Sequence, residues 1–263
     1  MNPKITVICL TYRRPELLEE AIQSFLMQDY AGEKELIIVN DEPEQELVFD
    51  HPQVKIHNCD VRAPALNVKH NYAVSMATGD LITIADDDDI YLPHRLTTIA
   101  SQQSGGIWFS NRCFTEQGED NDLVLVDGHI HCNIAYTKDQ FIKHGAYHNA
   151  KKVAFDVALI QSMRQDVTSI NEGGVTPSYI ARRRKDLSNH SSRSFVDYDL
   201  QYERHRENNS DFVKGRIVLN PQWRSNWTLK CVGAMELKPV PLHEIDDRYH
   251  PLSVVEIKKQ VKL

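Results

Sequence analysis

Residues 81–96 read LITIADDDDIYLPHRL, in which an apolar run ends at four consecutive aspartates, Asp86 to Asp89. The apolar run predicts a buried strand, and Pro93 is typical of the start of a helix. Four adjacent carboxylates repel one another, so we expect a cation to bind where they gather. Their oxygens suit a hard divalent cation that also takes water and phosphate oxygens. The alternative is a solvated acidic turn before the helix, since acidic residues favour helix N-termini.

Strand and helix patterns alternate on the N-terminal side of this run. Apolar runs predict strands at residues 4–10, 36–39 and 54–57. The spacing of apolar residues predicts helices at 15–26 and 65–77. This alternation is typical of an α/β domain with a Rossmann-like, mostly parallel sheet flanked by helices. Ligands bind such sheets beyond the carboxyl ends of the strands, where Asp41 and the aspartate run both lie.

The second half of the chain is less regular. Strands are predicted at 107–110, 123–126, 130–136 and 178–184, and a helix at 155–164. We expect the strands at 123–126 and 130–136 to form an antiparallel pair. Polarity rises from about Phe195, and residues 198–209 read as a charged helix.

Composition excludes several classes of protein. The chain has 263 residues, is 41% hydrophobic and carries a formal net charge of -7, which argues against a disulfide miniprotein, a disordered chain or a cationic nucleic-acid coat. No apolar run approaches the roughly 18 residues of a membrane span, and no signal peptide is recognisable. The five cysteines form no C-x-x-C pair. We therefore expect reduced thiols and a cytoplasmic protein.

Two further features lie at predicted strand ends. Tyr12 and the neighbouring arginines could stack a base and neutralise phosphate, although a helix entry with surface arginines is the simpler interpretation. Asp41 is either a turn or N-cap residue, or a carboxylate that accepts the imide N–H of a uracil ring.

Taken in order, the motifs resemble the family-2 glycosyltransferases of the GT-A fold. They are TYRRPELL at residues 11–18, VNDE at 39–42, Asn71 with ATGD at 77–80, and ADDDD at 85–89. Residues 86–96 are especially similar to spore-coat-type members. The resemblance is strong over residues 4–100 and weaker to about 193. It implies a GT-A domain at 1–194, with a nucleotide-sugar-binding half (1–100) and an acceptor half (101–194). Residues 195–263 would be a C-terminal extension that forms an acceptor or dimer surface.

The resemblance also implies roles for individual residues. The nucleotide-sugar would contact Thr11, Tyr12, Arg14, Asp41, Asn71, Asp86 and Asp87. The metal, Mn²⁺ or Mg²⁺, would bind Asp88 directly, with Asp86 and the loop residue His190 as further ligands. An exposed loop histidine is the alternative for His190.

In inverting members a carboxylate on a later helix acts as the general base. Asp156 matches the aspartate of the usual Glu-Asp pair, whereas Phe155 replaces the glutamate. Such a base takes the acceptor hydroxyl proton as the oxygen attacks. The alternative for Asp156 is a residue of the first helical turn, with Asp166 and Glu172 as the next candidates for the base.

The chain departs from the family pattern at two places. Arg13 stands where asparagine is usual, and Lys69-His70-Asn71 replaces Ala-Arg-Asn, so Lys69 or His70 would replace the usual arginine near the sugar. Donor-sugar specificity is therefore open. His129 and His131 are interpreted as structural residues on one face of a strand. The basic residues 182–185 would contact phosphates or remain solvated.

These observations predict an inverting, metal-dependent glycosyltransferase that uses a UDP-sugar. The acceptor would be a saccharide, a glycolipid or another hydroxyl-bearing molecule, and the basic residues leave a modified DNA base open. A homodimer also stays open. The alternatives are a catalytically inactive nucleotide-sugar-binding module and a nucleotidyltransferase, although residues 11–15 lack the glycines of a nucleotidyltransferase phosphate loop.

Overall fold

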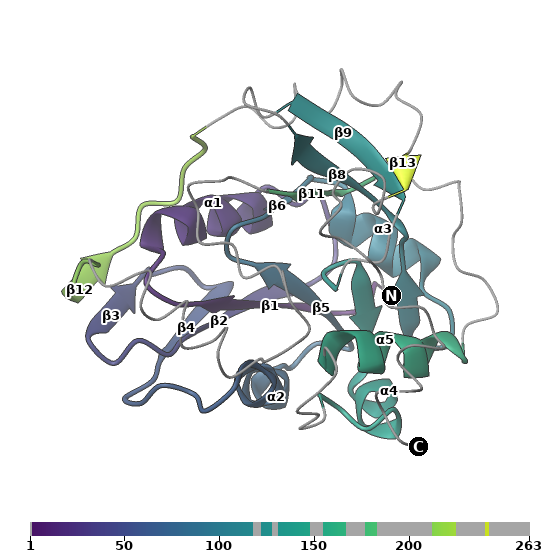
Figure 1. The fold of residues 1–263 in the computed structure, drawn as a ribbon, viewed down its shortest axis with the longest axis horizontal. Coiled ribbons are helices and arrows are strands. Elements are labelled where there is room, and N and C mark those ends of the chain that lie inside the picture. Colours follow the sequence, from purple (N-terminus) through teal and green to yellow (C-terminus); the bar gives the residue numbers. More distant parts are fainter. Residues whose placement is uncertain are drawn as a thin grey trace.

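The computed structural model describes residues 2–117, 122–127, 131–147, 155–166, 177–182, 212–224 and 240–241. Its central sheet has six strands in the order β4-β2-β1-β5-β10-β7 (Figure 1). Their bounds are β1 (Ile5–Thr11), β2 (Lys34–Asn40), β4 (Val54–Asn58), β5 (Leu81–Asp86), β7 (Ile107–Phe109) and β10 (Ile134–Tyr136). The first four of these strands are mutually parallel, whereas β10 is antiparallel to β5 and β7. The carboxyl ends of β1, β2 and β5 therefore lie side by side.

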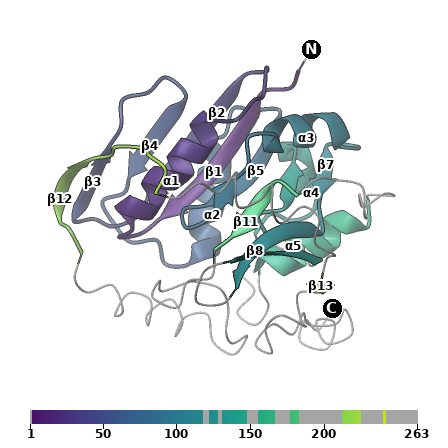
Figure 2. The ribbon, with the colours of Figure 1, turned by 90° about the horizontal axis from the view of Figure 1, so that it is seen from above.

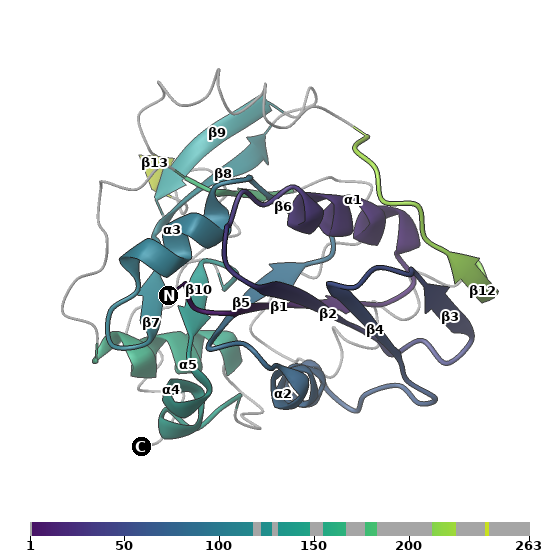
Figure 3. The ribbon, with the colours of Figure 1, turned by 180° about the vertical axis from the view of Figure 1, so that it is seen from behind.

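Helices cover both faces of the central sheet. Their bounds are α1 (Pro15–Leu26), α2 (Leu66–Met76), α3 (Arg95–Gln102), α4 (Lys138–Lys143) and α5 (Phe155–Arg164). Helices α1 and α3 lie on one face, and α2, α4 and α5 lie on the other (Figures 1 and 3). Because both faces are covered, β1, β2 and β5 are apolar along most of their length. No helix in the described ranges is both long and apolar enough to span a membrane.

A second sheet lies beyond α1 and α3, in the order β13-β9-β8-β11-β6 (Figure 1). Its strands are β6 (Ile90–Tyr91), β8 (Arg112–Gln117), β9 (Asp122–Asp127), β11 (Tyr179–Ala181) and β13 (Val240–Pro241). It packs its own small core, made of Ile90, Leu92, Phe114, Leu123, Leu125 and Ile180. Strand β6 follows the aspartate run directly, so this sheet fixes the C-terminal side of that run.

Residues 212–224, here called the C-terminal strap, run along the edge of the domain. They include β12 (Gly215–Val218), which pairs in parallel with β3 (Gln45–Val48). Viewed from above, β12 lies beside β3 while α1 crosses β1 (Figure 2). The far end of the strap contacts α1, where the Asn220 amide donates to Glu19 at 2.9 Å.

The turn before β5 is held by buried polar contacts. Glu35 on β2 is buried and accepts hydrogen bonds from the Thr6 hydroxyl, the Thr78 amide and the Thr78 hydroxyl at 2.7–2.8 Å. Next to it, Gly79 approaches β1 so closely that a Cβ there would lie 2.6 Å from the Thr6 nitrogen. The Thr-Gly pair of this motif therefore serves to join β1, β2 and β5.

Most predicted elements of the first half are confirmed, from the four parallel strands to α1 and α2. Two predictions in the second half are wrong. The strands near 123–126 and 130–136 do not pair with each other, because β9 pairs with β8 and β10 joins the central sheet. His131 lies in a turn before β10, and not on a strand. The charged helix predicted at 198–209 lies outside the described residues.

Candidate active site

The four aspartates after β5 point to different partners. Asp86 accepts a hydrogen bond from the Cys132 thiol at 2.9 Å. Asp87 and Asp88 both pair with Arg14, whose Nη1 lies 2.8 Å from Asp88 Oδ2. Burial raises the pKa of Asp87 to about 6, against the lowering effect of Arg14. Arg14 thus neutralises part of the charge, and the pKa of Asp86 stays raised by burial and by Asp88.

Asp89 is hydrogen-bonded to the second sheet and serves to hold the fold together. Its carboxylate accepts from the Tyr179 hydroxyl and from the Arg182 amide at 2.8 Å, which joins the aspartate run to β11. Arg182 is itself buried, and its side chain donates to the Asp88 carbonyl and to Glu20. The interpretation of Arg182 as a solvated residue is therefore wrong, because its guanidinium is buried against Glu20 and the Asp88 carbonyl. Residues 183–185 lie outside the described residues.

The carboxylates of this run suit a divalent cation. Asp86, Asp89 and Cys132 each place one ligand atom within 4.8 Å of the others. Asp89 is already engaged, however, and burial raises the pKa of the Cys132 thiol well above its ordinary value, which favours a protonated sulfur. The carboxylates of Asp86 and Asp88 offer the oxygen ligands that Mn²⁺ and Mg²⁺ prefer, and they too have partners, Cys132 and Arg14 respectively. Burial and the charge of Asp88 disfavour the ionised form of Asp86, and a cation bound at these carboxylates would stabilise that form.

A second group of polar residues lies at the ends of β1 and β2. Asp41 is 1% exposed and accepts from Arg62 Nη1 at 2.9 Å, from the Ala63 amide at 3.1 Å and from the buried Lys69. Lys69 also donates to the Thr11 carbonyl at 2.6 Å. The guanidinium of Arg62 lies 3.2 Å from the centre of the Tyr12 ring. Tyr12 and Asp41, predicted to recognise the base, are thus joined by one arginine.

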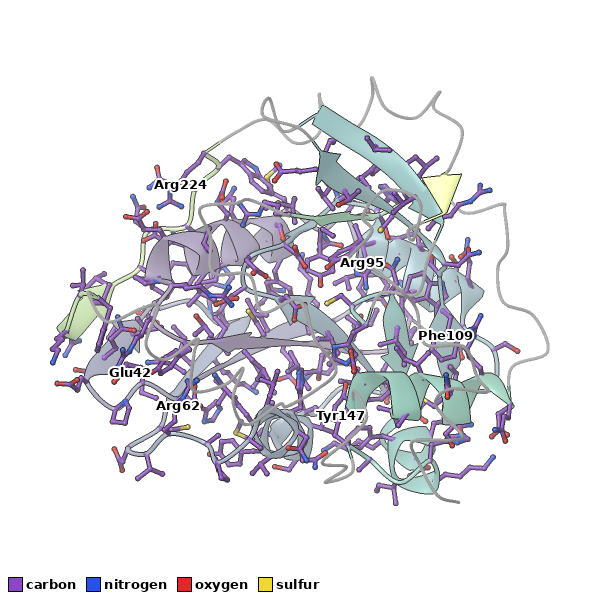
Figure 4. All side chains as sticks on the ribbon, viewed as in Figure 1. Glu42, Arg62, Arg95, Phe109, Tyr147 and Arg224 are labelled. Carbon is purple, nitrogen blue, oxygen red and sulfur yellow. The ribbon has the colours of Figure 1, made fainter. Side chains whose placement is uncertain are left out.

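Glu42 holds the Tyr12 end of this group. Its carboxylate accepts from Arg13 Nε and from the Glu44 amide, and a further hydrogen bond from the Tyr12 hydroxyl helps to lower the pKa of Glu42 against the effect of burial. Glu42 and Arg62 lie close together on the sheet edge, and Tyr147 lies by α2 and α5 (Figure 4). The candidate site therefore has two ends. One lies at Tyr12 and Asp41, where the nucleotide base is predicted to bind and which is called the base end, and the other lies on the far side of α2.

The second end contains two histidines and a tyrosine. His131 Nε2 lies 2.7 Å from the Tyr147 hydroxyl, and the ring of buried His70 lies 4.8 Å from that of Tyr147. Burial lowers the pKa of His70 well below its ordinary value, so it is neutral at physiological pH. Asn71 exchanges two hydrogen bonds of 3.0 and 3.1 Å with the Tyr147 main chain. Of the two residues considered for the missing arginine, Lys69 contacts Asp41, whereas His70 lies in this second cluster.

Asp156 lies in the first turn of α5, close enough to Tyr147 for its charge to help raise the tyrosine pKa, after the larger effect of burial. Its Oδ1 is buried, and within the described parts of the chain it has no hydrogen-bond partner. Asp166, at the other end of α5, pairs with Lys143 and lies 3.1 Å from His144 Nε2. His190 and Glu172 lie outside the described residues.

Sequence reasoning missed Arg62, Glu42, Cys132 and Tyr147. Glu42 could have been suspected from its place beside Asp41 after a buried strand. Cys132 and Tyr147 reach the site through strand pairing and a loop, which local patterns do not report.

Comparisons with known proteins agree with this architecture. The fold is that of GT-A glycosyltransferases: the chain superposes on Staphylococcus aureus TarS 1-349 in complex with UDP-GlcNAc with a TM-score of 0.55, at 16% identity, over 70% of this chain and 60% of that one. It superposes on the mannosyltransferase PcManGT from Pyrobaculum calidifontis, in complex with GDP-Man and Mn²⁺, with a TM-score of 0.52, at 15% identity, over 82% and 66% of the two chains.

The sequence match to a known family lies in the N-terminal part of the chain. Residues 6–104 match the model of glycosyl transferase family 2, and this match covers less than half of the chain. The chain is 37% identical over 110 residues to WcaA of Escherichia coli K12, a glycosyl transferase assigned to colanic acid biosynthesis. It is 31% identical over 111 residues to the GalNAc(5)-diNAcBac-PP-undecaprenol beta-1,3-glucosyltransferase of Campylobacter jejuni. The first match covers 39% of this chain and 38% of WcaA, and the second covers 40% of this chain and 36% of the Campylobacter relative.

Proposed function

We propose that this chain is an inverting, metal-dependent glycosyltransferase that moves a sugar from a nucleotide-sugar to an acceptor hydroxyl. The observation that carries the proposal is the convergence of Tyr12, Asp41 and the aspartate run at adjoining strand ends, within the residues that match the family-2 model. An aromatic ring, a buried acceptor and clustered carboxylates are respectively suited to a base, an imide N–H and a metal-bound diphosphate.

The donor proposed is a UDP-sugar. Asp41 is buried at the end of β2, and an ionised carboxylate only accepts hydrogen bonds, which is the chemistry that an imide N–H requires. Lys69 lies beside Asp41 as a buried counter-charge, so an arriving base would not have to supply one. The complex of TarS with UDP-GlcNAc is consistent with this choice, whereas PcManGT is described with GDP-Man.

Asp88 and Asp86 are proposed to hold Mn²⁺ or Mg²⁺. When bound there, the cation would stabilise the negative charge that develops on the departing diphosphate. Arg14 lies against Asp87 and Asp88 and keeps both carboxylates in place. Asp89 and Arg182 fix the rest of the run from the second sheet.

Asp156 is proposed as the general base. The acceptor oxygen forms a bond to the anomeric carbon, the bond from that carbon to the diphosphate oxygen breaks, and the hydroxyl proton passes to Asp156. Support comes from its buried Oδ1, which lacks a hydrogen-bond partner among the described residues, and from its position beside Tyr147. A single displacement of this kind inverts the anomeric configuration.

The acceptor proposed is a saccharide or a glycolipid, the latter in line with the name of the Campylobacter relative. A homodimer and a DNA-base acceptor remain predictions without support from the comparisons. The test is a panel of nucleotide-sugars incubated with the protein and Mn²⁺, in which release of free nucleoside diphosphate is followed by mass spectrometry. We expect slow, metal-dependent hydrolysis of a UDP-sugar, and binding without hydrolysis of any donor would support the inactive module instead.

A further inference from the structure

Arg13, a departure from the family pattern, has an unusual conformation. Its φ is +59°, in the left-handed region that non-glycine residues rarely adopt. Its guanidinium is nearly buried, pairs with Glu42, and lies 4.8 Å from the Tyr12 ring centre and 3.7 Å from the Phe212 ring centre. Arg13 thus contacts two aromatic rings, one in the predicted base site and one in the C-terminal strap.

The strap places Phe212 by pairing with β3. The Gly215 amide donates to the Glu44 carbonyl at 2.8 Å, and Gln45 Nε2 donates to the Val213 carbonyl at 2.6 Å. At the other end of the ladder, the buried Leu219 donates to the Val48 carbonyl at 2.9 Å. Phe212 therefore directly precedes Val213, from which the strap is held against β3 by hydrogen bonds.

Strand β3 begins just after Glu42, so the strap and the base end share their support. Glu42 accepts from Arg13 and Tyr12 and also from the Glu44 amide, which belongs to the turn leading into β3. A continuous set of contacts therefore runs from Phe212 through Arg13 and Glu42 to Tyr12. The family match ends at residue 104, well before the strap.

We propose that Phe212 is a positioning residue for the nucleotide site, which makes the C-terminal strap a part of that site. Through its contact with the Arg13 guanidinium, Phe212 keeps Arg13 against Tyr12 and so orients the ring that receives the base. The inference rests on the proposed function, since it assumes that Tyr12 stacks the base. One cation–π contact at a partly exposed position supports an effect of about 3- to 30-fold on nucleotide affinity.

The test is UDP affinity, measured by calorimetry with Mn²⁺ on the full chain. Phe212→Ala should weaken UDP binding by about 3- to 30-fold, and Phe212→Tyr, which keeps the aromatic face, should bind as the wild type does. Trp223→Ala is the matched control, because Trp223 belongs to the same strap but donates to Met27 at the C-terminal end of α1. It should lower the melting temperature without changing UDP affinity. In an Arg13→Ala background, Phe212→Ala should cause no further loss.

The outcomes separate this inference from the function on which it rests. If Tyr12→Ala abolishes UDP binding while Phe212→Ala binds like the wild type, the role of Phe212 is overturned and the function stands. Equal losses in Phe212→Ala and Trp223→Ala would also overturn it, because the strap would then act only through stability. If Phe212→Ala does not fold, Phe212→Leu replaces it, with the same weakening expected. A wild-type chain that binds none of UDP, dTDP or GDP would overturn the proposed function and this inference together.

Discussion

The guanidinium of Arg62 stacks on the Tyr12 ring, with its carbon 3.2 Å from the ring centre, and at the same time donates a 2.9 Å hydrogen bond to Asp41. A pyrimidine base is also planar and also carries an N–H donor. Arg62 therefore occupies, in this structure, both contacts that the proposed base would make, and the base must displace it or stack outside it.

The first prediction concerns that competition. Arg62→Ala should tighten UDP binding by about 3- to 30-fold, because removing one cation–π contact also removes a group that the base must displace. Lys69→Ala is the control: it leaves Asp41 without its buried counter-charge and should weaken binding. Calorimetric titration of both variants decides the matter. Weaker binding by Arg62→Ala would mean that Arg62 contacts the nucleotide directly.

The second prediction concerns the choice of base. If Asp41 accepts the single imide N–H of a pyrimidine, uridine and thymidine nucleotides should bind better than guanosine nucleotides, whose larger base brings an amino group beside its ring N–H. In a competition assay, UDP and dTDP should displace a bound fluorescent UDP derivative at lower concentrations than GDP. Equal or tighter binding of GDP would refute the role given to Asp41.

The third prediction concerns the metal. Asp88→Asn should abolish Mn²⁺-dependent UDP binding while the melting temperature changes little, because the side chain keeps its size and its place beside Arg14. Asp89→Asn is the matched control in the same run. It should lower the melting temperature, because Asp89 joins the run to Tyr179 and Arg182, but should leave metal-dependent binding in place. If Asp89→Asn instead abolished metal-dependent UDP binding and Asp88→Asn did not, the metal site would be assigned to Asp86, Asp89 and Cys132.

The fourth prediction concerns stability at low pH. Burial opposes ionisation of Glu35, but hydrogen bonds from Lys55, Thr78 and Thr6 hold its pKa down to about 2. A folded-state pKa below the unfolded value stabilises the fold above about pH 4.5, and this contribution disappears as the pH falls toward 2. Glu35→Gln should therefore lower the free energy of unfolding at pH 7 by about 1–3 kcal/mol.

Chemical denaturation between pH 7 and pH 2 measures this effect. The stability of Glu35→Gln should fall less steeply with acid than that of the wild type, because the titrating carboxyl group is absent. The exposed Glu44, which pairs with Lys214 on the strap, provides the control. Glu44→Gln should change stability by less than about 1 kcal/mol. Parallel pH curves for Glu35→Gln and the wild type would contradict the prediction.

The parallel strands and the aspartate cluster could be predicted because their signals are local. Apolar runs that end in acidic residues mark both a buried strand and its carboxyl end, so Asp41 and Asp86 were placed correctly at the ends of β2 and β5. Strand partners in the second half could not be predicted in the same way. Neighbouring strands in sequence pair only about two-thirds of the time, and β9 and β10 belong to the exceptions.

Contacts between distant parts of the chain were also beyond prediction. Arg62 reads as a loop residue, and only the fold brings it onto Tyr12. Phe212 lies in a polar stretch with no family pattern, yet the pairing of β12 with β3 places it on Arg13. Arg182 looked like part of a basic surface, because the sequence does not show that Glu20 and Asp88 surround it.

The most direct test of the proposed chemistry is the turnover of Asp156→Asn with the donor identified in the nucleotide-sugar panel, measured alongside its UDP affinity. Asp166→Asn, at the other end of the same helix, is the control and should keep wild-type turnover. Loss of a general base typically costs about 10²–10⁴ in rate. The account predicts a loss of that size in Asp156→Asn with unchanged UDP affinity, and turnover within about threefold of the wild type, well short of that range, would contradict it.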